Sequence, residues 1–214
     1  MWEPDLTRER LLAAAGQVFA EEGFQGATIR KIKERADANI AAVNYYFGDK
    51  ERLYIEAVKF AFGSCVKDMR FPDWPPGTPA DQKLRDFIAV FVSRLLDPSR
   101  PQWHPQLMMR ELASPSGACF EIVRDYIRPV AMRLSGVLED ILPTEMPGWK
   151  RFMVAFSIVG QCLYYVQNKP IAIQLVGEED FRNFDAKTVA EHITHFTLAA
   201  LGLREPLGHS RAPT

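Results

Sequence analysis

Apolar residues recur three and four positions apart along most of the chain, and the breaks in this pattern are rich in proline and glycine. The spacing predicts amphipathic helices, because residues three or four positions apart share one face of a helix. Helices are expected at residues 7–23, 29–36, 40–47, 49–69, 80–96, 106–113, 117–141, 149–168 and 185–203. The sequence therefore predicts an all-α protein.

Residues 28–50 predict two short helices joined by a tight turn. Thr28 and Asn39 are good N-caps, because their side-chain oxygens can accept hydrogen bonds from unpaired backbone N–H groups. Asp37 suits the turn, since aspartate tolerates the left-handed backbone conformation. The positions expected to face inward are apolar: Ile29, Ile32, Ala36, Val43 and Phe47.

The outward face of the second helix carries no charge, which is unusual for a solvated helix. Its residues are Ile40, Ala41, Ala42, Asn44 and Tyr45. Cationic residues surround it in sequence: Arg30, Lys31, Lys33, Arg35 and Lys50. Small, apolar and amide side chains read base edges, while cations hold phosphates. The arrangement is typical of a helix-turn-helix, although two packed helices without DNA binding remain the alternative.

The same stretch resembles the DNA-binding signature of TetR/AcrR-family transcriptional regulators. The matching residues read T-I-R-K-I-x-x-x-A-x-A-N-x-A-A-V-N-Y-Y-F-G-D-K-x-x-L, and the resemblance covers residues 7–58. The version N-I-A-A-V-N-Y-Y-F-G-D-K is similar to the CecR-like subset. Three positions depart from the usual pattern: Asp37 replaces glycine, Ala38 replaces valine and Asn44 replaces tyrosine.

The resemblance implies an N-terminal three-helix DNA-binding domain and a C-terminal helical domain for ligand binding and dimerisation. We expect these domains at residues 1–48 and 49–204, followed by a flexible tail at 205–214. Asn44 is expected to contact a base edge, with adenine the natural partner of its amide. Thymine-methyl contacts are expected from Ile40, Ala41 and Ala42. Phosphate contacts are expected from Thr28, Arg30, Lys31, Asn39, Tyr45, Tyr46 and Lys50.

Composition limits how such a protein would bind DNA. The net charge is −1. The first 60 residues hold nine Lys or Arg against ten Asp or Glu, so positive charge is local and non-specific affinity should be modest. The three cysteines have no metal-binding or disulfide spacing, which fits a reducing cytoplasm. No signal peptide or membrane-spanning run is recognisable, so a cytoplasmic protein is expected.

The helices expected at residues 149–168 and 185–203 have wide apolar faces, which predict a dimer interface. A symmetric interface of two helices from each chain would bury them, and the resemblance implies the same arrangement. The residues expected there are Phe152, Phe156, Val159, Gly160, Leu163, Val189, Ile193, Phe196 and Ala200.

Methionine and aromatic residues with a few polar groups suit a permissive ligand pocket. The candidates are Met108, Met109, Phe120, Tyr126, Gln161, Tyr164 and Tyr165, with plain core packing as the alternative for each. Charged residues from Arg110 to Arg128, including Glu111, are expected on solvated helix faces. His192 and His195 are three apart but lack further ligands, so no metal or cofactor is expected. No serine lies in a nucleophile elbow, so no catalytic residue is expected.

These observations predict a ligand-responsive transcriptional regulator, a repressor that binds a palindromic operator as a homodimer. Its expected partners are double-stranded DNA, an unknown small-molecule effector and a second copy of the chain, without a membrane. The alternative is a helical ligand-binding or scaffold protein that does not bind an operator, which the weak net charge favours. An all-helical enzyme is the least supported class.

Overall fold

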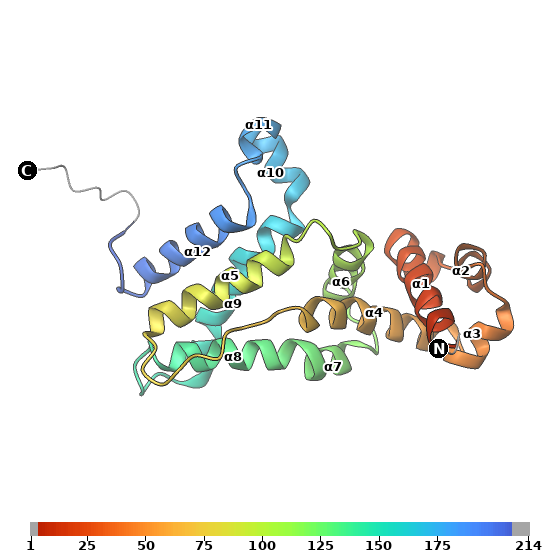
Figure 1. Cartoon of the computed structure of the whole chain (residues 1–214), viewed down its shortest axis with the longest axis horizontal. Coiled ribbons are helices and arrows are strands. Elements are labelled where there is room, and N and C mark those ends of the chain that lie inside the picture. The colour runs from red at the N-terminus through yellow and green to blue at the C-terminus, as the bar shows by residue number, and fades with distance from the viewer. Residues whose placement is uncertain (1–3, 207–214) are drawn as a thin grey trace, which may run out of the picture. The chain divides into compact units, whose positions relative to one another are not determined.

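The computed structural model describes residues 4–206, without the side chains of Pro4, Asp5 and Ile40, and it confirms the all-α fold. Within this range it contains no strand (Figure 1). The helices are α1 Pro4–Gly26, α2 Ile29–Ala36, α3 Ile40–Phe47, α4 Lys50–Lys67, α5 Ala80–Leu95, α6 Trp103–Ala113, α7 Cys119–Ile122, the π-helical turn η1 Val123–Ile127, α8 Arg128–Glu139, α9 Gly148–Gln167, α10 Lys169–Val176, α11 Glu178–Phe181 and α12 Ala186–Ala200. The short helices α10 and α11 add to the set expected from the sequence.

The helices pack into two compact units that do not follow the order of the chain. The first unit comprises the chain up to Lys67 together with Ser99–Arg128. The second comprises Asp68–Pro98 and the chain from Pro129 onward. By packing, α4 and α6 therefore belong with the N-terminal helices, whereas the functional boundary at residues 48 and 49 stays a prediction. Of the predicted tail at 205–214, residues 207–214 lie outside the described range.

The core of the first unit forms where α1 meets α2, α4 and α6. The side chains of Leu11, Ala15 and Phe19 recur along one face of α1 and are fully buried. The Phe19 ring meets the Tyr54 ring of α4 edge-on, with 5.0 Å between centroids. Phe24 meets the same tyrosine at 5.3 Å. This aromatic cluster stabilises the contact between α1 and α4 beyond the burial of apolar area alone.

Helix α6 is fixed to α1 by one close contact and one capping interaction. A Cβ atom placed on Gly16 would lie 2.0 Å from the Trp103 ring, so only glycine admits the indole at this position. At the end of α1, Arg110 donates hydrogen bonds to the carbonyls of Ala20 and Glu21, at 2.8 and 3.2 Å. These carbonyls lie just before Gly23, whose positive φ of 72° interrupts the helix. The arginine therefore satisfies acceptors that the helix end leaves open.

The second unit is built around α5, which packs against α9 and α12. The proline-rich segment before α5 lies within this unit: Phe71 stacks on Phe87 of α5 with ring centroids 4.9 Å apart. Arg133 lies over the rings of Phe71 and Trp74. No helix among the described residues is long and apolar enough to cross a membrane.

A π-helical turn precedes α8, where the sequence places Pro129. The Arg128 N–H bonds to the Val123 carbonyl, five residues back. Pro129 has no N–H to donate and its ring would crowd the carbonyl four residues back, that of Asp125. The wider turn moves these carbonyls out of conflict, so the proline explains the local π geometry.

Replacing Gly16 with alanine should destabilise the protein, because the new Cβ forces the buried Trp103 ring to move. Overpacking of this kind costs about 1–3 kcal/mol, despite the better helix propensity of alanine. Gly136→Ala is the matched control, since nothing lies within 4 Å of a Cβ at that helical position. The free energy of unfolding of the control should rise by up to about 1 kcal/mol, because alanine favours the helix more than glycine does. Urea denaturation measures both, and a Gly16→Ala variant as stable as the control would contradict the tight contact.

Candidate nucleic-acid interface

The turn between α2 and α3 has the geometry that the sequence predicted. Asp37 adopts the left-handed conformation, with φ 48° and ψ 52°. The following Ala38 N–H bonds to the Lys33 carbonyl at 3.1 Å, which closes the end of α2. From α1, Arg10 donates a hydrogen bond of 2.8 Å to the Ala36 carbonyl. The turn is therefore held both by its own backbone and by the neighbouring helix.

Side-chain caps fix the start of each helix around the turn. The Thr28 hydroxyl accepts a bond from the Lys31 N–H at 3.3 Å, and the Asn39 side chain accepts one from the Ala41 N–H at 3.1 Å. A third cap starts α4, where the Asp49 carboxylate accepts from the Arg52 N–H at 2.8 Å. Each cap satisfies a backbone donor that a helix start leaves unpaired. Both predicted caps, at Thr28 and Asn39, are confirmed.

One face of α3 presents polar and small side chains to solvent. Ala41 and Asn44 are exposed, and Tyr45 is 83% exposed. The expectation is less accurate for Ala42 and Tyr46, which are half-buried against the core of the first unit. The side chain of Ile40 lies outside what the structure describes. The face available to a partner is thus narrower than expected and centres on Asn44 and Tyr45.

The cations of α2, which form part of the expected cationic frame, are mostly engaged with glutamates. Three of them form ion pairs: Arg30 with Glu34 at 2.9 Å, Lys31 with Glu22 at 2.9 Å, and Arg35 with Glu21 at 2.8 Å. Exposed pairs of this kind contribute little to stability, so a phosphate can replace the carboxylate at small cost. The glutamates therefore lower the net positive charge of this surface, while the arginine and lysine side chains remain available as hydrogen-bond donors.

Lys50, the predicted phosphate contact at the start of α4, is half-buried. Its ammonium nitrogen lies 4.6 Å from the centre of the Phe24 ring. The attraction between an ammonium group and an aromatic face is worth about 0.5–1 kcal/mol at an exposed site. Lys50 is thereby held beside the first turn of α4 rather than extended into solvent.

A buried carboxylate lies at the contact between α4 and α6, where the sequence predicted a solvated face. Glu111 is 1% exposed, so that prediction is wrong. Its oxygens accept hydrogen bonds from the Tyr54 hydroxyl at 2.9 Å and from the backbone N–H and hydroxyl of Ser116 at 2.8 and 3.0 Å. The three donors compensate for the loss of water. Burial, and then the hydrogen bond to Glu111, raise the pKa of Tyr54 above its ordinary value.

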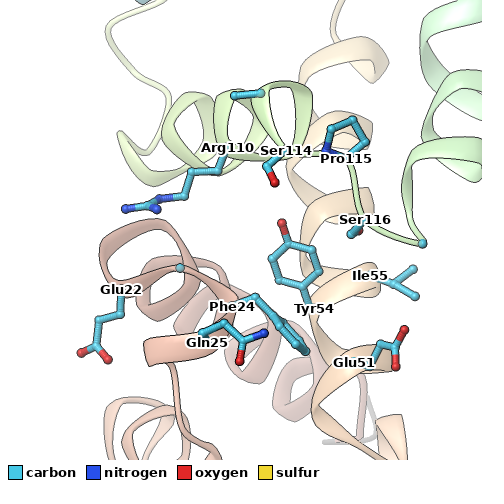
Figure 2. A pocket seen from close by; sticks show the side chains of 13 residues that line it. Glu22, Phe24, Gln25, Glu51, Tyr54, Ile55, Arg110, Ser114, Pro115 and Ser116 are labelled. Carbon is cyan, nitrogen blue, oxygen red and sulfur yellow. The ribbon is translucent and has the colours of Figure 1, made fainter.

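A cavity of about 680 Å³ lies in the first unit, between the end of α1, α4 and the loop after α6. Figure 2 shows the rings of Phe24 and Tyr54 close together, with Arg110 and Ser114 across from them and Ile55 directed away from the two rings. None of the predicted pocket residues lines this cavity. Their helical spacing gave no information about which faces remain open after packing.

The predicted pocket residues are divided between the two units. Those in the first unit are Met108, Met109, Phe120 and Tyr126, and those in the second are Gln161, Tyr164 and Tyr165. Phe120 is 74% exposed, so its side chain is a surface group rather than an enclosed wall. Whether the others contact an effector stays a prediction.

The predicted dimer residues divide into an exposed set and a buried set. Phe156 of α9 is 66% exposed, and Phe196 of α12 is also exposed. Gly160 and Ala200 are exposed, while Phe152, Val159 and Leu163 are half-buried. Val189 and Ile193 lie in the core of the second unit, so they have no surface to offer a partner, and their assignment to an interface is wrong.

The exposed apolar surface on α9 extends beyond the predicted set. Trp149, Met153 and Tyr164 are large, exposed side chains on the same helix as Phe156. Trp149, Met153 and Phe156 are four and three positions apart, and Tyr164 follows Phe156 about two turns later, so all four share one face. The histidines are engaged elsewhere: His192 contacts the Phe196 ring, and His195 Nε2 lies 3.1 Å from the Glu205 carbonyl oxygen. Within residues 4–206 no three His, Cys, Asp or Glu side chains gather as a metal site.

The capped pair α2–α3, with its exposed, uncharged second helix, is the arrangement of a helix-turn-helix transcriptional regulator. Comparison with known proteins agrees. Residues 11–57 match the family described as bacterial regulatory proteins, tetR family. Residues 80–202, more than half of the chain, match the C-terminal domain of the HTH-type transcriptional dual regulator CecR. The chain belongs to the TetR family and carries a CecR-type C-terminal domain, which confirms the resemblance found in residues 28–50.

Individual relatives show different extents of similarity. The dual regulator CecR of Shigella flexneri is 24% identical over 208 residues, which is 92% of this chain and 93% of the relative. The repressor NicS of Pseudomonas putida is 40% identical over 90 residues, so the match spans only 41% of either chain. The regulator FadR of Bacillus subtilis, solved in complex with stearoyl-CoA, shares the fold with a TM-score of 0.65 and 17% identity, over 89% of this chain and 97% of that chain.

Replacing Tyr54 with phenylalanine should destabilise the protein, because Glu111 loses one of its donors while it stays buried. The expected loss is about 1–3 kcal/mol at neutral pH. Since the pKa of Tyr54 is raised in the folded state, its contribution is present below pH 10 and is lost as the pH rises above that ordinary value. The difference between the wild type and the variant should therefore shrink above pH 10.

Urea denaturation at pH 7 and above pH 10 measures this difference. Tyr45→Phe is the control, since Tyr45 is largely exposed and its variant should unfold like the wild type at both pH values. A Tyr54→Phe variant that matches Tyr45→Phe at pH 7 would show that the bond to Glu111 contributes nothing.

Proposed function

We propose that this TetR-family protein is a ligand-responsive repressor that acts in the cytoplasm and reads a palindromic operator as a homodimer. The observation that carries the proposal is the face of α3, where Asn44 and Tyr45 are exposed on a helix capped at Asn39. A side chain reads bases only if its helix is held rigidly enough to fix the distance and angle of the contact. The caps and the turn at Asp37 provide that rigidity.

Within the proposed complex, Asn44 bonds to a base edge in the major groove, with adenine as the natural partner of its amide. Ile40, Ala41 and Ala42 are the candidates for thymine methyl groups. The phosphate contacts proposed from the sequence are Thr28, Arg30, Lys31, Asn39, Tyr45, Tyr46 and Lys50. Arg30 and Lys31 must exchange a glutamate for a phosphate to make this contact, so they gain less from the phosphate than unpaired cations would. Binding to DNA then depends more on contacts to the bases.

A second copy of the chain is proposed to pack on α9 and α12. The exposed side chains of Phe156 and Phe196 supply apolar surface that is more stable when buried. A two-fold axis would bring these side chains of one copy against the same side chains of the other. A dimer also matches the symmetry of a palindrome. Its two α3 helices would enter successive major grooves about 34–36 Å apart.

An effector is proposed to act by changing that spacing. A ligand that binds more tightly to dimers whose α3 helices are wrongly spaced lowers the fraction of dimers that fits the operator. This difference in affinity is enough to release the DNA. The stearoyl-CoA complex of FadR shows that a regulator with this fold can hold a ligand. The description of CecR as a dual regulator supports a second possibility for this chain, activation at some promoters, because that match covers almost the whole chain.

Selection of bound sequences from random duplex DNA, at two salt concentrations, tests the proposal. A two-fold symmetric motif that persists at the higher salt concentration is the expected result. Binding that is weak, independent of sequence and abolished by salt would contradict operator reading, because phosphate contacts alone behave in that way. That result would favour a helical ligand-binding or scaffold protein.

Asn44→Ala should weaken binding to the selected operator by about 1–3 kcal/mol and relax the preference at one base position, because the amide that reads that base is lost. Binding titrations on the operator and on scrambled duplexes give both quantities. Ser99→Ala, a change in a surface loop outside α2 and α3, is the control and should bind like the wild type. An equal loss on every sequence would show that Asn44 does not read a base.

Phe156→Asp should separate the dimer, because the charge would be placed within the proposed apolar interface. The dissociation constant of the dimer should rise about 30-fold or more, as for a residue central to an interface. Sedimentation equilibrium measures it. Met132→Asp on α8 is the control, since Met132 is also exposed but lies outside the proposed interface. If the two variants associate equally well, the interface lies elsewhere.

A further inference from the structure

A glycine lies at the joint between the reading helix α3 and the helix that follows it. α3 ends at Phe47 and α4 begins at Lys50. Between them, Gly48 has a positive φ of 78°, a conformation that glycine adopts without strain. Nothing lies within 4 Å of a Cβ at this position, so no side chain packs closely against the joint itself. Contacts on either side of the glycine therefore fix the angle between α3 and α4.

Arg8 of α1 contacts both of these helices, and all three belong to the first unit (Figure 1). Its guanidinium carbon lies 5.6 Å from the centre of the Phe47 ring, at the end of α3. One guanidinium nitrogen donates a hydrogen bond of 2.9 Å to Glu56 Oε2 on α4. The aromatic face attracts the cation, and the charged hydrogen bond gives the contact a direction. One side chain thus joins the chain before Gly48 to the chain after it.

Glu56 is a well-oriented anchor for this arginine, since its side chain is only 18% exposed. Its other oxygen, Oε1, lies 3.2 Å from a guanidinium nitrogen of Arg52 and 3.8 Å from the ammonium of Lys59. Lys59 is bonded more closely to Glu121 of α7, at 2.7 Å. Arg52 and Lys59 both lie on α4 with Glu56, so among these three cations Arg8 alone joins the carboxylate to another helix.

We propose that Arg8 is a positioning residue for operator reading, which fixes the angle of α3 and so the direction in which Asn44 meets a base. The inference rests on the proposed reading of an operator by α3. Asn44 lies three residues before Phe47 on the same helix, so a shift of the Phe47 end moves both. Base contacts require a defined geometry. Arg8 therefore acts on discrimination between sequences, and not by binding a phosphate.

The proposal is tested by titrating one sample of each variant with the selected operator and with a scrambled duplex. The ratio of the two dissociation constants cancels the fraction of folded protein, so a general loss of stability leaves it unchanged. Arg8→Gln should lower this discrimination ratio about three- to tenfold, because a cation–π contact and an ion pair are lost. The dependence of binding on salt should stay the same. An equal loss on both duplexes, with a salt slope lower by about one, would make Arg8 a phosphate contact and overturn the proposal.

Glu56→Gln separates positioning from simple electrostatics. Removal of a negative charge should favour binding to any DNA, yet loss of the anchor for Arg8 should lower the discrimination ratio about twofold or more. Combined with Arg8→Gln, it should lower the ratio no further than Arg8→Gln alone, since both act through one contact. Glu9→Gln on α1 and Arg85→Gln on α5 make the same changes of charge at residues that take no part in this contact. These controls should keep the wild-type ratio.

Hydrogen exchange of the free protein tests the contact without DNA. Arg8→Gln should speed exchange of the amides at 43–48 about threefold or more, because α3 loses one of its supports, while the amides of α6 stay as in the wild type. Unchanged exchange at 43–48, an equal rise in α6, or an unchanged discrimination ratio in Arg8→Gln would each overturn the proposal. A wild type that does not distinguish the two duplexes would refute operator reading itself, and exchange would then still decide whether Arg8 holds α3.

Discussion

The packing of α6 on α1 is the contact on which the first unit depends. The indole of Trp103 occupies space that only a glycine at position 16 leaves open, and Arg110 satisfies the carbonyls at the other end of the same contact. Next to Arg110 on α6, the buried carboxylate of Glu111 is bonded to Tyr54 of α4. A helix distant in sequence therefore holds in place α1 and α4, which in turn support the reading helices α2 and α3.

Electrostatics give the recognition surface a different character from that of a strongly basic DNA-binding protein. Three of the four cations of α2 are paired with glutamates of the same unit, in agreement with the nearly balanced charge of the first 60 residues. Counterion release is the main driving force for binding that ignores sequence. A surface that has already neutralised three of these cations gains less from counterion release. Discrimination then depends more on α3, where Asn44 and Tyr45 are exposed.

Local features could be predicted from the sequence, and long-range features could not. The caps at Thr28 and Asn39 use residues within the same turn of helix, and Asp37 itself adopts the left-handed conformation, so the sequence pattern was sufficient for them. The bond from Arg10 to the Ala36 carbonyl joins distant parts of the chain and could not be predicted. Glu111 looked like an ordinary helix-surface charge, because its donor Tyr54 is 57 residues away. For α12, a wide apolar face cannot distinguish a core face from an interface face, which explains the wrong assignment of Val189 and Ile193.

The close approach of Trp103 to Gly16 also limits how this protein can exchange parts with its relatives. A hybrid regulator made by joining its first 48 residues to the body of another member would receive a foreign residue opposite Gly16. A side chain smaller than tryptophan at position 103 would leave a void beside Gly16. In the reverse hybrid, which keeps Trp103 but takes its first helix from the relative, a Cβ at position 16 would collide with the indole. Functional hybrids are therefore expected to need α1 through α4 and the segment 99–128 from one parent. Across related genes, positions 16 and 103 should change together rather than one at a time.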